Sequence, residues 1–391
     1  MKPSEQNNFS DLSFNLKKEN PIPCYFFFYW QLFRRDTHLS LEICEIFGIG
    51  NSCTFVKFGD KKKEKMKTIR WGMIGCGDVT EIKSGPAFNK VDNSKLVAVM
   101  RRDGEKAKDY AKRHSVPKWY QDANDLINDD EVNAIYIATP PAFHEEYAIA
   151  SINAGKPVYI EKPMALNFES ANMIAKLAGE KNIKVSIAHY RRGQPLFNKV
   201  KQLLKEKAIG DVCFARLQFY KKQLPSEALQ VPKVAWRINP AISGGGLFHD
   251  IAPHQLDLMY WFFGEIEKAS GYSANQSKFY NADDIVSGNI LFKSGVIFNG
   301  LWCFNVADEN VKDLCEIQGS EGKMRFPIFE HKKIEIIKNG TTEEILFEPL
   351  QHVQQPLIQE VVNYFLGKGA NPSPAQDGAK VMWLLDEFTK K

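Results

Sequence analysis

The chain has 391 residues, of which 44% are apolar and 25% are charged. These fractions are those of a globular protein with room for two ordinary domains, and they fit neither a disordered nor a membrane-embedded chain. Lys and Arg number 51 against 47 acidic residues, which gives a net charge of +4. So small an excess, spread along the chain, gives no indication of nucleic-acid binding.

The cysteines and the apolar stretches bear on the compartment. The seven cysteines are an odd number with irregular spacing and no CxxC pair, so we expect neither a disulfide framework nor a zinc site. A reducing, cytoplasmic setting follows as the expectation. The apolar stretch 22–33 is shorter than the ~20 residues of a spanning helix, and Arg34, Arg35 and Asp36 follow it. We therefore expect no membrane segment and no signal peptide.

The first 65 residues differ from the rest of the chain. They show no sustained helical or strand period, and they end in the lysine-rich run 61–65 just before Met66. The sequence KTIRWGMIGCGDV follows at once and has the pattern of a first Rossmann strand and its turn. We therefore expect either that Met66 is the true start or that residues 1–65 are a poorly ordered extension.

From residue 68 onward, short apolar runs alternate with amphipathic segments. The pattern predicts strands over 69–74, 96–100, 134–138, 158–160 and 184–188, and helices over 104–114, 122–128, 143–154 and 168–181. Strands that are nearly continuously apolar and separated by helices indicate a parallel sheet covered on both faces. Residues 66–188 are thus predicted to form a Rossmann NAD(P)-binding domain in a protein of the α/β class.

Beyond about residue 190 the strands no longer alternate with helices. After a helix near 196–207 we expect strands over 212–220, 285–293, 296–304, 311–318, 332–338 and 342–347, and then helices over 356–366 and 375–389. Ser294-Gly295 and Asn339-Gly340 suit tight antiparallel turns. Residues 189–391 are thus predicted to be an α+β substrate-binding and oligomerisation domain with an open, mostly antiparallel sheet.

A glycine turn lies where a dinucleotide-binding loop is expected, between the first strand and the following helix. Gly75 permits the tight turn, and Gly77 lets the backbone approach a pyrophosphate. Asp78 and Val79 continue the turn, and Thr80 replaces the usual third small residue, which predicts slightly looser helix–strand packing. The strand–turn–helix context makes this motif specific.

The end of the second strand bears on the choice of cofactor. An NAD site usually has an acidic residue there, whereas this chain has Arg101 and Arg102. Two guanidinium groups suit a 2′-phosphate, so NADP is the preferred cofactor and NAD the second choice. In the alternative, both arginines are solvated and Asp103 binds the ribose.

Two further motifs carry chemistry. Glu161-Lys162-Pro163 follows a predicted parallel strand, which places Lys162 at the carboxyl edge of the sheet, where α/β folds bind ligands. Far downstream, three glycines at 244–246 precede Asp250 and His254. Because Pro253 is tolerated in a first helical turn, we expect a helix to begin near Asp250, with His254 on the same face.

These motifs resemble those of the glucose–fructose oxidoreductase/inositol dehydrogenase/MocA (Gfo/Idh/MocA) family. The resemblance is carried by GCGDVT at 75–80, ATPPAFH at 138–144, EKP at 161–163 and WR…GGG…HD…H at 236–254, and it spans the chain from Met66 onward. It implies an NAD(P)-dependent oxidoreductase that transfers hydride between nicotinamide and a carbinol or carbonyl carbon of a sugar, polyol or related cyclic substrate.

The resemblance also implies roles for individual residues. Lys162 would lie beside the nicotinamide and the reacting carbinol, with Asp250 and His254 contributed by the second domain, and the Lys162–Pro163 bond is often cis in such proteins. The positions that match the cofactor-lining segments are Thr139, Pro140, His144 and Glu161. Those that match the surroundings of the substrate are Tyr190, Arg191, Arg192, Trp236 and Arg237.

Oxidation of a secondary alcohol requires a base for the hydroxyl proton. His254 titrates near neutrality and is the first candidate, while Lys162 would hydrogen-bond the same oxygen and could share the transfer. Asp250 would orient the substrate or fix the imidazole. Asp257, three residues after His254, could instead be a structural partner of that histidine. His189 and His249 are expected to be structural, and we expect no metal site.

The substrate itself stays open among sugars, inositols, sugar acids and dihydrodiols. We expect the loops 190–195 and 220–245 to line its pocket, including Lys221, Lys222 and Gln223. An open sheet would leave one apolar face exposed, so a homodimer or homotetramer is expected. Two alternatives share the same fold: a glycosidase that oxidises its sugar transiently with bound NAD, and a non-catalytic dinucleotide-binding regulator.

Overall fold

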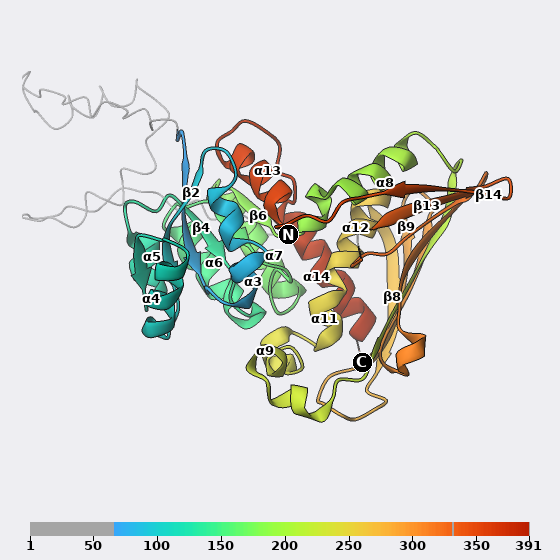
Figure 1. Cartoon of the computed structure of the whole chain (residues 1–391), viewed down its shortest axis with the longest axis horizontal. Coiled ribbons are helices and arrows are strands. Elements are labelled where there is room, and N and C mark those ends of the chain that lie inside the picture. Colours follow the sequence, from blue (N-terminus) through green and yellow to red (C-terminus); the bar gives the residue numbers. More distant parts are fainter. Residues whose placement is uncertain (1–65, 331, 391) are drawn as a thin grey trace, which may run out of the picture. The chain divides into compact units, whose positions relative to one another are not determined.

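A computed structural model describes residues 66–330 and 332–390, which contain two β-sheets (Figure 1). The chain from Lys65 onward forms one compact unit. The expectations for residues 1–65, including a start at Met66, lie outside the described residues.

The first sheet has six parallel strands in the order β3-β2-β1-β4-β5-β6. This order, with the strand sequence reversing on either side of β1, is that of a doubly wound Rossmann fold. Strands β4, β5 and β6 are buried along their whole length, and β1 and β2 are buried except at Arg70 and at the first two residues of β2, as expected when helices cover both faces. The strands are β1 Ile69–Ile74, β2 Ser94–Met100, β3 Lys118–Tyr120, β4 Ala134–Ile137, β5 Val158–Ile160 and β6 Val185–Ile187.

The helices of this half follow the predicted segments closely. Asp103 and Asn167 cap two of them by accepting hydrogen bonds from the backbone N–H groups of Lys106 and Ser170, which fixes where each helix begins. The helices are α3 Asp78–Ile82, α4 Gly104–Arg113, α5 Ala123–Asn128, α6 His144–Asn153 and α7 Phe168–Glu180.

The second sheet has eight strands in the order β14-β13-β12-β11-β7-β10-β9-β8. Its pairs are antiparallel except for β7 and β10, which run parallel. Six strands lie where the sequence predicts them, and β8 and β12 were missed because β8 is mostly polar or exposed and β12 has four residues. The strands are β7 Val212–Lys222, β8 Ile266–Ala274, β9 Ile285–Phe292, β10 Ile297–Val306, β11 Lys312–Gly319, β12 Lys323–Phe326, β13 Lys333–Lys338 and β14 Thr341–Leu346.

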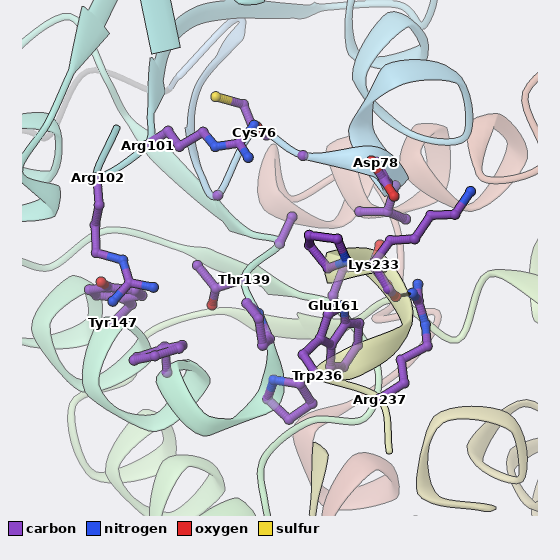
Figure 2. A pocket seen from close by; sticks show the side chains of 18 of the residues that line it. Cys76, Asp78, Arg101, Arg102, Thr139, Tyr147, Glu161, Lys233, Trp236 and Arg237 are labelled. Carbon is purple, nitrogen blue, oxygen red and sulfur yellow. Dashed lines mark hydrogen bonds between the residues drawn. The ribbon is translucent and has the colours of Figure 1, made fainter. Parts of the chain in front are cut away.

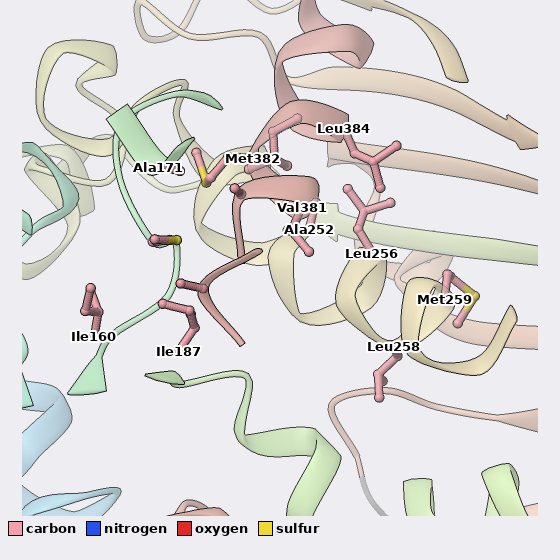
Figure 3. Close-up of a cluster of buried hydrophobic side chains, with 14 of the residues drawn as sticks. Ile160, Ala171, Ile187, Ala252, Leu256, Leu258, Met259, Val381, Met382 and Leu384 are labelled. Atoms are coloured by element: carbon pink, nitrogen blue, oxygen red, sulfur yellow. The ribbon is translucent and has the colours of Figure 1, made fainter. Parts of the chain in front are cut away.

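One helix packs against elements of both sheets. Helix α14 (Ala375–Thr389) contacts α7 and β6 of the first half and β8, β9 and α12 (Pro253–Phe263) of the second half (Figure 1). Figure 3 shows the shared core, in which Val381 and Met382 of α14 lie between the strand residue Ile187 and Leu256 of α12. Because this apolar core is continuous, the carboxyl edge of the parallel sheet is held against the helices of the second half.

The remaining helices are short or lie at the ends of the second half. They are α8 Pro195–Lys205, α9 Pro232–Ala235, α10 Pro240–Ser243, α11 Leu247–Ile251 and α13 Gln355–Phe365. None of the helices in residues 66–330 and 332–390 is long and apolar enough to cross a membrane.

Candidate active site

The glycine turn connects β1 to α3 and contains two glycines, and the physical reason for glycine differs between the two positions. Gly75 has a φ of +94°, and a Cβ there would lie 2.8 Å from Thr139, so this position needs glycine for the fold itself. Gly77 has a φ of −137°, and a Cβ there would have no neighbour closer than 3.9 Å. Since nothing in the protein requires glycine at position 77, the space it leaves is explained by a ligand that approaches the backbone.

The turn opens into a cavity of about 470 Å³ at the carboxyl edge of the parallel sheet (Figure 2). Its walls come from the ends of β1, β2, β4 and β5 and, on the other side, from the segment 232–250 of the second half. The predicted residues that line it are Gly75, Gly77, Asp78, Val79, Arg101, Arg102, Thr139, Pro140, Glu161, Lys162, Trp236, Arg237 and Asp250. The carboxyl edge is where open α/β sheets bind dinucleotides.

Two observations test whether a dinucleotide fits this cavity. The first is the open space at Gly77, and the second is Thr139, whose buried Oγ1 has no hydrogen-bond partner within the described ranges. A buried hydroxyl without a partner is costly, so it favours a ligand that supplies one. The residues present therefore fit a bound nicotinamide dinucleotide.

The predicted contact of His144 with the cofactor is not found. Its ring is fully buried behind the cavity, where its nitrogens lie 2.7 Å from the Thr139 carbonyl oxygen and 3.0 Å from that of Pro163. Burial lowers the pKa of His144 to about 4. The imidazole is therefore neutral and donates to one of these two carbonyl oxygens, since a neutral ring has a single N–H. It packs behind the loops that form the cavity wall instead of lining the cavity.

Sequence reasoning missed several lining residues. Phe143 and Tyr147 stand on the segment that follows β4, and the Arg102 guanidinium lies 4.8 Å from the centre of the Phe143 ring. Phe143 is part of the ATPPAFH motif and could have been found there, whereas Tyr147 lies one helical turn after His144 and carries no motif. The other lining residues that were not predicted are Cys76, Met100, Ala138 and Pro141, whereas Asp103 was the alternative ribose contact and Pro232 and Lys233 lie in the predicted loop 220–245.

Lys162 and Asp250 join the two halves at the cavity. The Lys162–Pro163 bond is cis, as the family resemblance implies, and Lys162 Nζ donates to Asp250 Oδ1 at 2.8 Å and to the Asp250 carbonyl oxygen at 2.7 Å. Arg237 Nε donates to Asp250 Oδ2 at 3.0 Å. One largely buried carboxylate thus forms ion pairs with two cations. Burial would raise the pKa of Asp250, but Lys162 and Arg237 outweigh it and lower that pKa, so Asp250 is ionised.

The expected helix starting near Asp250 is wrong. Asp250 lies in the short helix α11, which ends at Ile251, and His254 lies in the first turn of α12, which begins at Pro253. Proline has no N–H group to donate to the preceding turn, so the helical hydrogen bonding is interrupted between the two residues. Asp250 bonds to Lys162 and Arg237, and no hydrogen bond joins it to His254 in the described part of the chain.

His254 lies in an apolar and cationic environment. Its ring is 5% exposed and contacts Tyr190 and Phe329 edge-on, with centroid distances of 5.0 and 5.8 Å. Burial, and then the charges of Arg191 and Lys162, hold the pKa of His254 well below its usual value of 6.5. The expectation that this residue titrates near neutrality is therefore wrong, and the imidazole is neutral at pH 7.

Asp257 is not the structural partner of His254. It accepts hydrogen bonds from Arg192 at 2.6–3.1 Å, and His189 Nδ1 lies 2.9 Å from its Oδ1. Arg192 also donates to Asp377 at 2.7 Å. Arg192 is thus a buried structural residue, and its expected place beside the substrate is wrong, while His189 is structural as predicted.

The basic segment expected to line the substrate pocket lies elsewhere. Lys221, Lys222 and Gln223 are at the exposed end of β7 and do not line the cavity, and Lys222 pairs with Asp308 at 3.0 Å. The loop 190–195 is likewise absent from the cavity wall, although Tyr190 and Arg191 flank His254. The second half contributes Pro232, Lys233, Trp236 and Arg237 from the loop 220–245 as expected.

A Rossmann sheet whose dinucleotide cavity is closed by an aspartate from a second sheet domain, paired with the lysine after β5, defines a nicotinamide-dependent oxidoreductase. Residues 69–189 match the oxidoreductase family with an NAD-binding Rossmann fold, and residues 197–325 match the GFO/IDH/MocA C-terminal domain. The chain belongs to the Gfo/Idh/MocA family and is an NAD(P)-dependent oxidoreductase.

Individual relatives agree with this assignment. The chain is 46% identical to Oxidoreductase P35 of Formosa agariphila over 82% of this chain and 98% of that protein. It is 25% identical to D-xylose 1-dehydrogenase [NADP(+)] of Haloarcula marismortui over 73% of this chain and 81% of the relative. Among solved structures, levoglucosan dehydrogenase in complex with NADH and levoglucosan has the same fold, with a TM-score of 0.73 at 22% identity over 82% of this chain and 96% of that one.

The two glycines of the turn give a testable distinction. We expect Gly77→Ala to keep the thermal unfolding midpoint of the parent protein within a few degrees and to weaken NAD(P) binding at least about 10-fold, because the added methyl group meets only the ligand. Binding is measured by titration calorimetry. Gly179→Ala is the matched control, since a Cβ there has no neighbour within 4 Å and the residue lies on α7, outside the cavity lining. Unchanged affinity in Gly77→Ala would remove the assigned reason for this glycine.

Proposed function

We propose that this oxidoreductase transfers hydride between a nicotinamide and a carbinol or carbonyl carbon of a sugar, polyol or related cyclic compound. The observation that carries the proposal is the Lys162 ammonium group, held by Asp250 in the wall of the dinucleotide cavity. Relatives whose names refer to D-xylose and levoglucosan support the substrate class. The bound cofactor would supply the hydride acceptor or donor.

Lys162 is the proposed proton donor to the reacting oxygen. An ammonium group has three N–H bonds, and Asp250 accepts two of them, which leaves the third for a substrate oxygen. The Asp250 carboxylate also forms an ion pair with Arg237. It therefore holds the lysine in place while its negative charge is shared between two cations. In the oxidative direction the same lysine would take the proton back, as the reverse path requires.

His254 is proposed to bind the substrate as a neutral imidazole. Its depressed pKa makes the protonated form costly, so it is a poor proton donor at pH 7, whereas a neutral ring accepts a hydrogen bond from a substrate hydroxyl group. Asp250 is proposed to position Lys162. Tyr190, Arg191, Trp236 and Arg237 are the further residues proposed to contact the substrate.

Replacement of Lys162 tests the assignment. We expect Lys162→Met to lower kcat by at least about 100-fold, because general acid–base catalysis contributes that much or more, while the Kd for the cofactor changes less than about threefold. Initial rates and cofactor titrations provide the two numbers. The control is Lys233→Met, which removes another cavity-lining lysine and should keep kcat within a few-fold.

The same assay separates the alternatives. Near-normal kcat in Lys162→Met would refute the assigned role. A glycosidase with transient oxidation would release cleaved sugar without a net change in nicotinamide absorbance, and a non-catalytic regulator would bind the cofactor without any turnover of a sugar and polyol panel.

NADP is proposed as the preferred cofactor. Arg101 and Arg102 line the cavity at the end of β2, and Arg101 Nη1 donates to the Cys76 carbonyl oxygen at 3.2 Å, which holds its side chain beside the glycine turn. Asp103 is the N-cap of α4 and pairs with Lys106 at 2.8 Å, so its carboxylate is already engaged. This favours the two arginines over Asp103 as the groups that contact the adenosine ribose and its 2′-phosphate.

We expect the ratio of kcat/KM for NADPH to that for NADH to exceed about 10 in the parent enzyme, because each charge-assisted contact to the phosphate adds affinity that NADH lacks. Arg101→Ala and Arg102→Ala should each reduce this ratio mainly through the KM for NADPH. Lys108→Ala, an exposed α4 residue outside the cavity, serves as the control. Equal ratios in all four proteins would overturn the preference.

We further propose that the chain divides at 188/189 into a cofactor domain and a substrate domain, works in the cytoplasm and forms a homodimer or homotetramer. The oligomer proposal rests on the strands of the second sheet, where Phe214, Tyr272 and Ile297 are 38%, 83% and 53% exposed. Large apolar side chains on one open sheet favour contact with a second copy. Size-exclusion chromatography with light scattering should give at least twice the monomer mass, and a monomer at micromolar concentration would contradict it.

A further inference from the structure

Arg191 is a buried cation without an anionic hydrogen-bond partner. Its side chain is 2% exposed, its Nε–H donates to the Ile328 carbonyl oxygen at 3.1 Å, and its buried Nη1 has no acceptor in the described part of the chain. A guanidinium group has five N–H bonds, and leaving buried ones unpaired is costly. The Arg191 Nη1 group therefore indicates a hydrogen-bond acceptor that comes from a ligand and not from the described part of the chain.

The neighbouring Arg192 shows what a structural arginine looks like in the same place. Its nitrogens donate to the carboxylates of Asp257 and Asp377 and to the Pro372 carbonyl oxygen, at 2.6–3.2 Å. Both arginines lie on the same short 3-10 turn after β6, at nearly equal burial. The difference between them is therefore the missing acceptor at Arg191, not the depth of the site.

Arg191 lies beside His254. The Arg191 guanidinium is 5.1 Å from the centre of the Tyr190 ring and 4.3 Å from that of Phe329. The same two rings contact the His254 imidazole at centroid distances of 5.0 and 5.8 Å. Two aromatic rings thus hold the unpaired guanidinium next to the imidazole that we propose to bind the substrate.

A carboxylate near Arg191 fixes its surroundings without pairing with it. Asp313 on β11 accepts the N–H groups of Ile328 and Phe329, at 3.1 and 2.6 Å. These two residues supply the carbonyl group that bonds Arg191 Nε and the ring against which the guanidinium packs. Asp313 therefore holds the segment that orients Arg191, while its own oxygens are engaged by the backbone.

The charges around His254 favour an anion. Lys162 and Arg237 share the single carboxylate of Asp250, so these three side chains carry a net positive charge, and the charge of Lys83 also acts on His254. Two further carboxylates lie nearby: that of Glu161 accepts hydrogen bonds from Tyr136, Gln354 and the Lys162 backbone N–H, and that of Asp313 accepts from the backbone. Arg191 adds a further positive charge that no hydrogen-bonded carboxylate offsets. A planar guanidinium edge among aromatic rings suits an oxyacid group by both charge and geometry.

We infer that Arg191 is an anion subsite for the substrate, and that the enzyme acts on a polyol carrying an oxyacid group, a carboxylate or a phosphate ester, in preference to a neutral sugar. The inference rests on the proposed function, since it places this group beside His254 and Lys162. It narrows the substrates from sugars in general to sugar acids or sugar phosphates.

The first experiment compares matched substrates in the parent enzyme. D-glucose, D-glucuronate and D-glucose 6-phosphate, and the corresponding galactose set, are assayed with NADP⁺ and NAD⁺ by the absorbance of reduced nicotinamide. We expect kcat/KM for one anionic member of a set to exceed that of its neutral counterpart at least about 10-fold, as expected for a hydrogen bond to a charged group. A higher kcat/KM for the uronate indicates a carboxylate substrate, and a higher kcat/KM for the sugar 6-phosphate indicates a phosphate ester.

The second experiment removes the charge. Arg191→Gln should lower kcat/KM for the anionic substrate about 10- to 100-fold, mainly through KM, and lower that for the neutral sugar by a clearly smaller factor, because the neutral sugar loses a contact but no ion pair. Arg191→Lys keeps the charge without the planar fork and should recover part of the loss. Lys205→Gln, an exposed lysine at the end of α8, is the control. If Arg191→Gln does not fold, the parent comparison and Arg191→Lys decide the question.

Binding provides a readout that does not depend on turnover. The same anions are titrated against the cofactor-loaded protein by tryptophan fluorescence, in the parent and the Arg191 variants. If neutral and anionic sugars are turned over equally well, and Arg191→Gln affects both alike, the subsite is overturned and the proposed function stands. Anion binding that depends on Arg191, without reduction of nicotinamide by any sugar, would support the subsite and overturn the proposed function. If the anions do not bind and no sugar is turned over, both the subsite and the proposed function are overturned.

Discussion

The buried ion pair between Arg192 and Asp257 fixes the geometry on which the site depends. Arg192 follows the last strand of the parallel sheet, Asp257 lies on α12, and Asp377 on α14 binds the same guanidinium. A buried pair of this kind is weak evidence for stability, but removing one partner would leave an uncompensated charge in the core. It therefore restricts α12 to one position relative to the carboxyl edge of the sheet. His254, one turn before Asp257, is placed by that restriction.

The apolar core between the two sheets also holds the helices of the second half at the carboxyl edge of the parallel sheet. Helix α14 fills the space between α7 and the strands β8 and β9, so the two halves share side chains instead of meeting across a polar surface. The cavity at the sheet edge consequently has one wall from each half, and Lys162 can reach Asp250 across it. The oxidoreductase site is thus a property of the joined halves.

The distribution of charge in this site explains the proposed division of labour. Asp250 is ionised because two cations hold it, and His254 is neutral because burial and neighbouring cations oppose its protonation. A neutral imidazole and a tethered ammonium group can bind one substrate oxygen each, and proton transfer then falls to the lysine. The Arg191 guanidinium, whose Nη1 has no acceptor among the described residues, packs on the rings that contact His254 and is the basis of the proposed preference for an anionic substrate.

The sequence by itself determined the features that depend on short stretches of chain. The periodicity of apolar residues identified the parallel sheet and most of the second sheet, the glycine turn located the cofactor cavity, and EKP placed Lys162 at the sheet edge. It also gave the family, which the comparisons confirm. These features are local, because a turn, a strand end or a motif is set by neighbouring residues.

Only the tertiary structure decided which polar groups are paired. Arg191 and Arg192 are adjacent and of one residue type, yet Arg192 meets Asp257 and Asp377 from 65 and 185 residues away, and Arg191 meets no carboxylate by hydrogen bond. The same holds for His144, which lies behind the cavity wall, and for His254, whose burial removes its titration from the neutral range. Burial and pairing arise from contacts between distant segments, so the sequence pattern names the candidates and the fold assigns their partners.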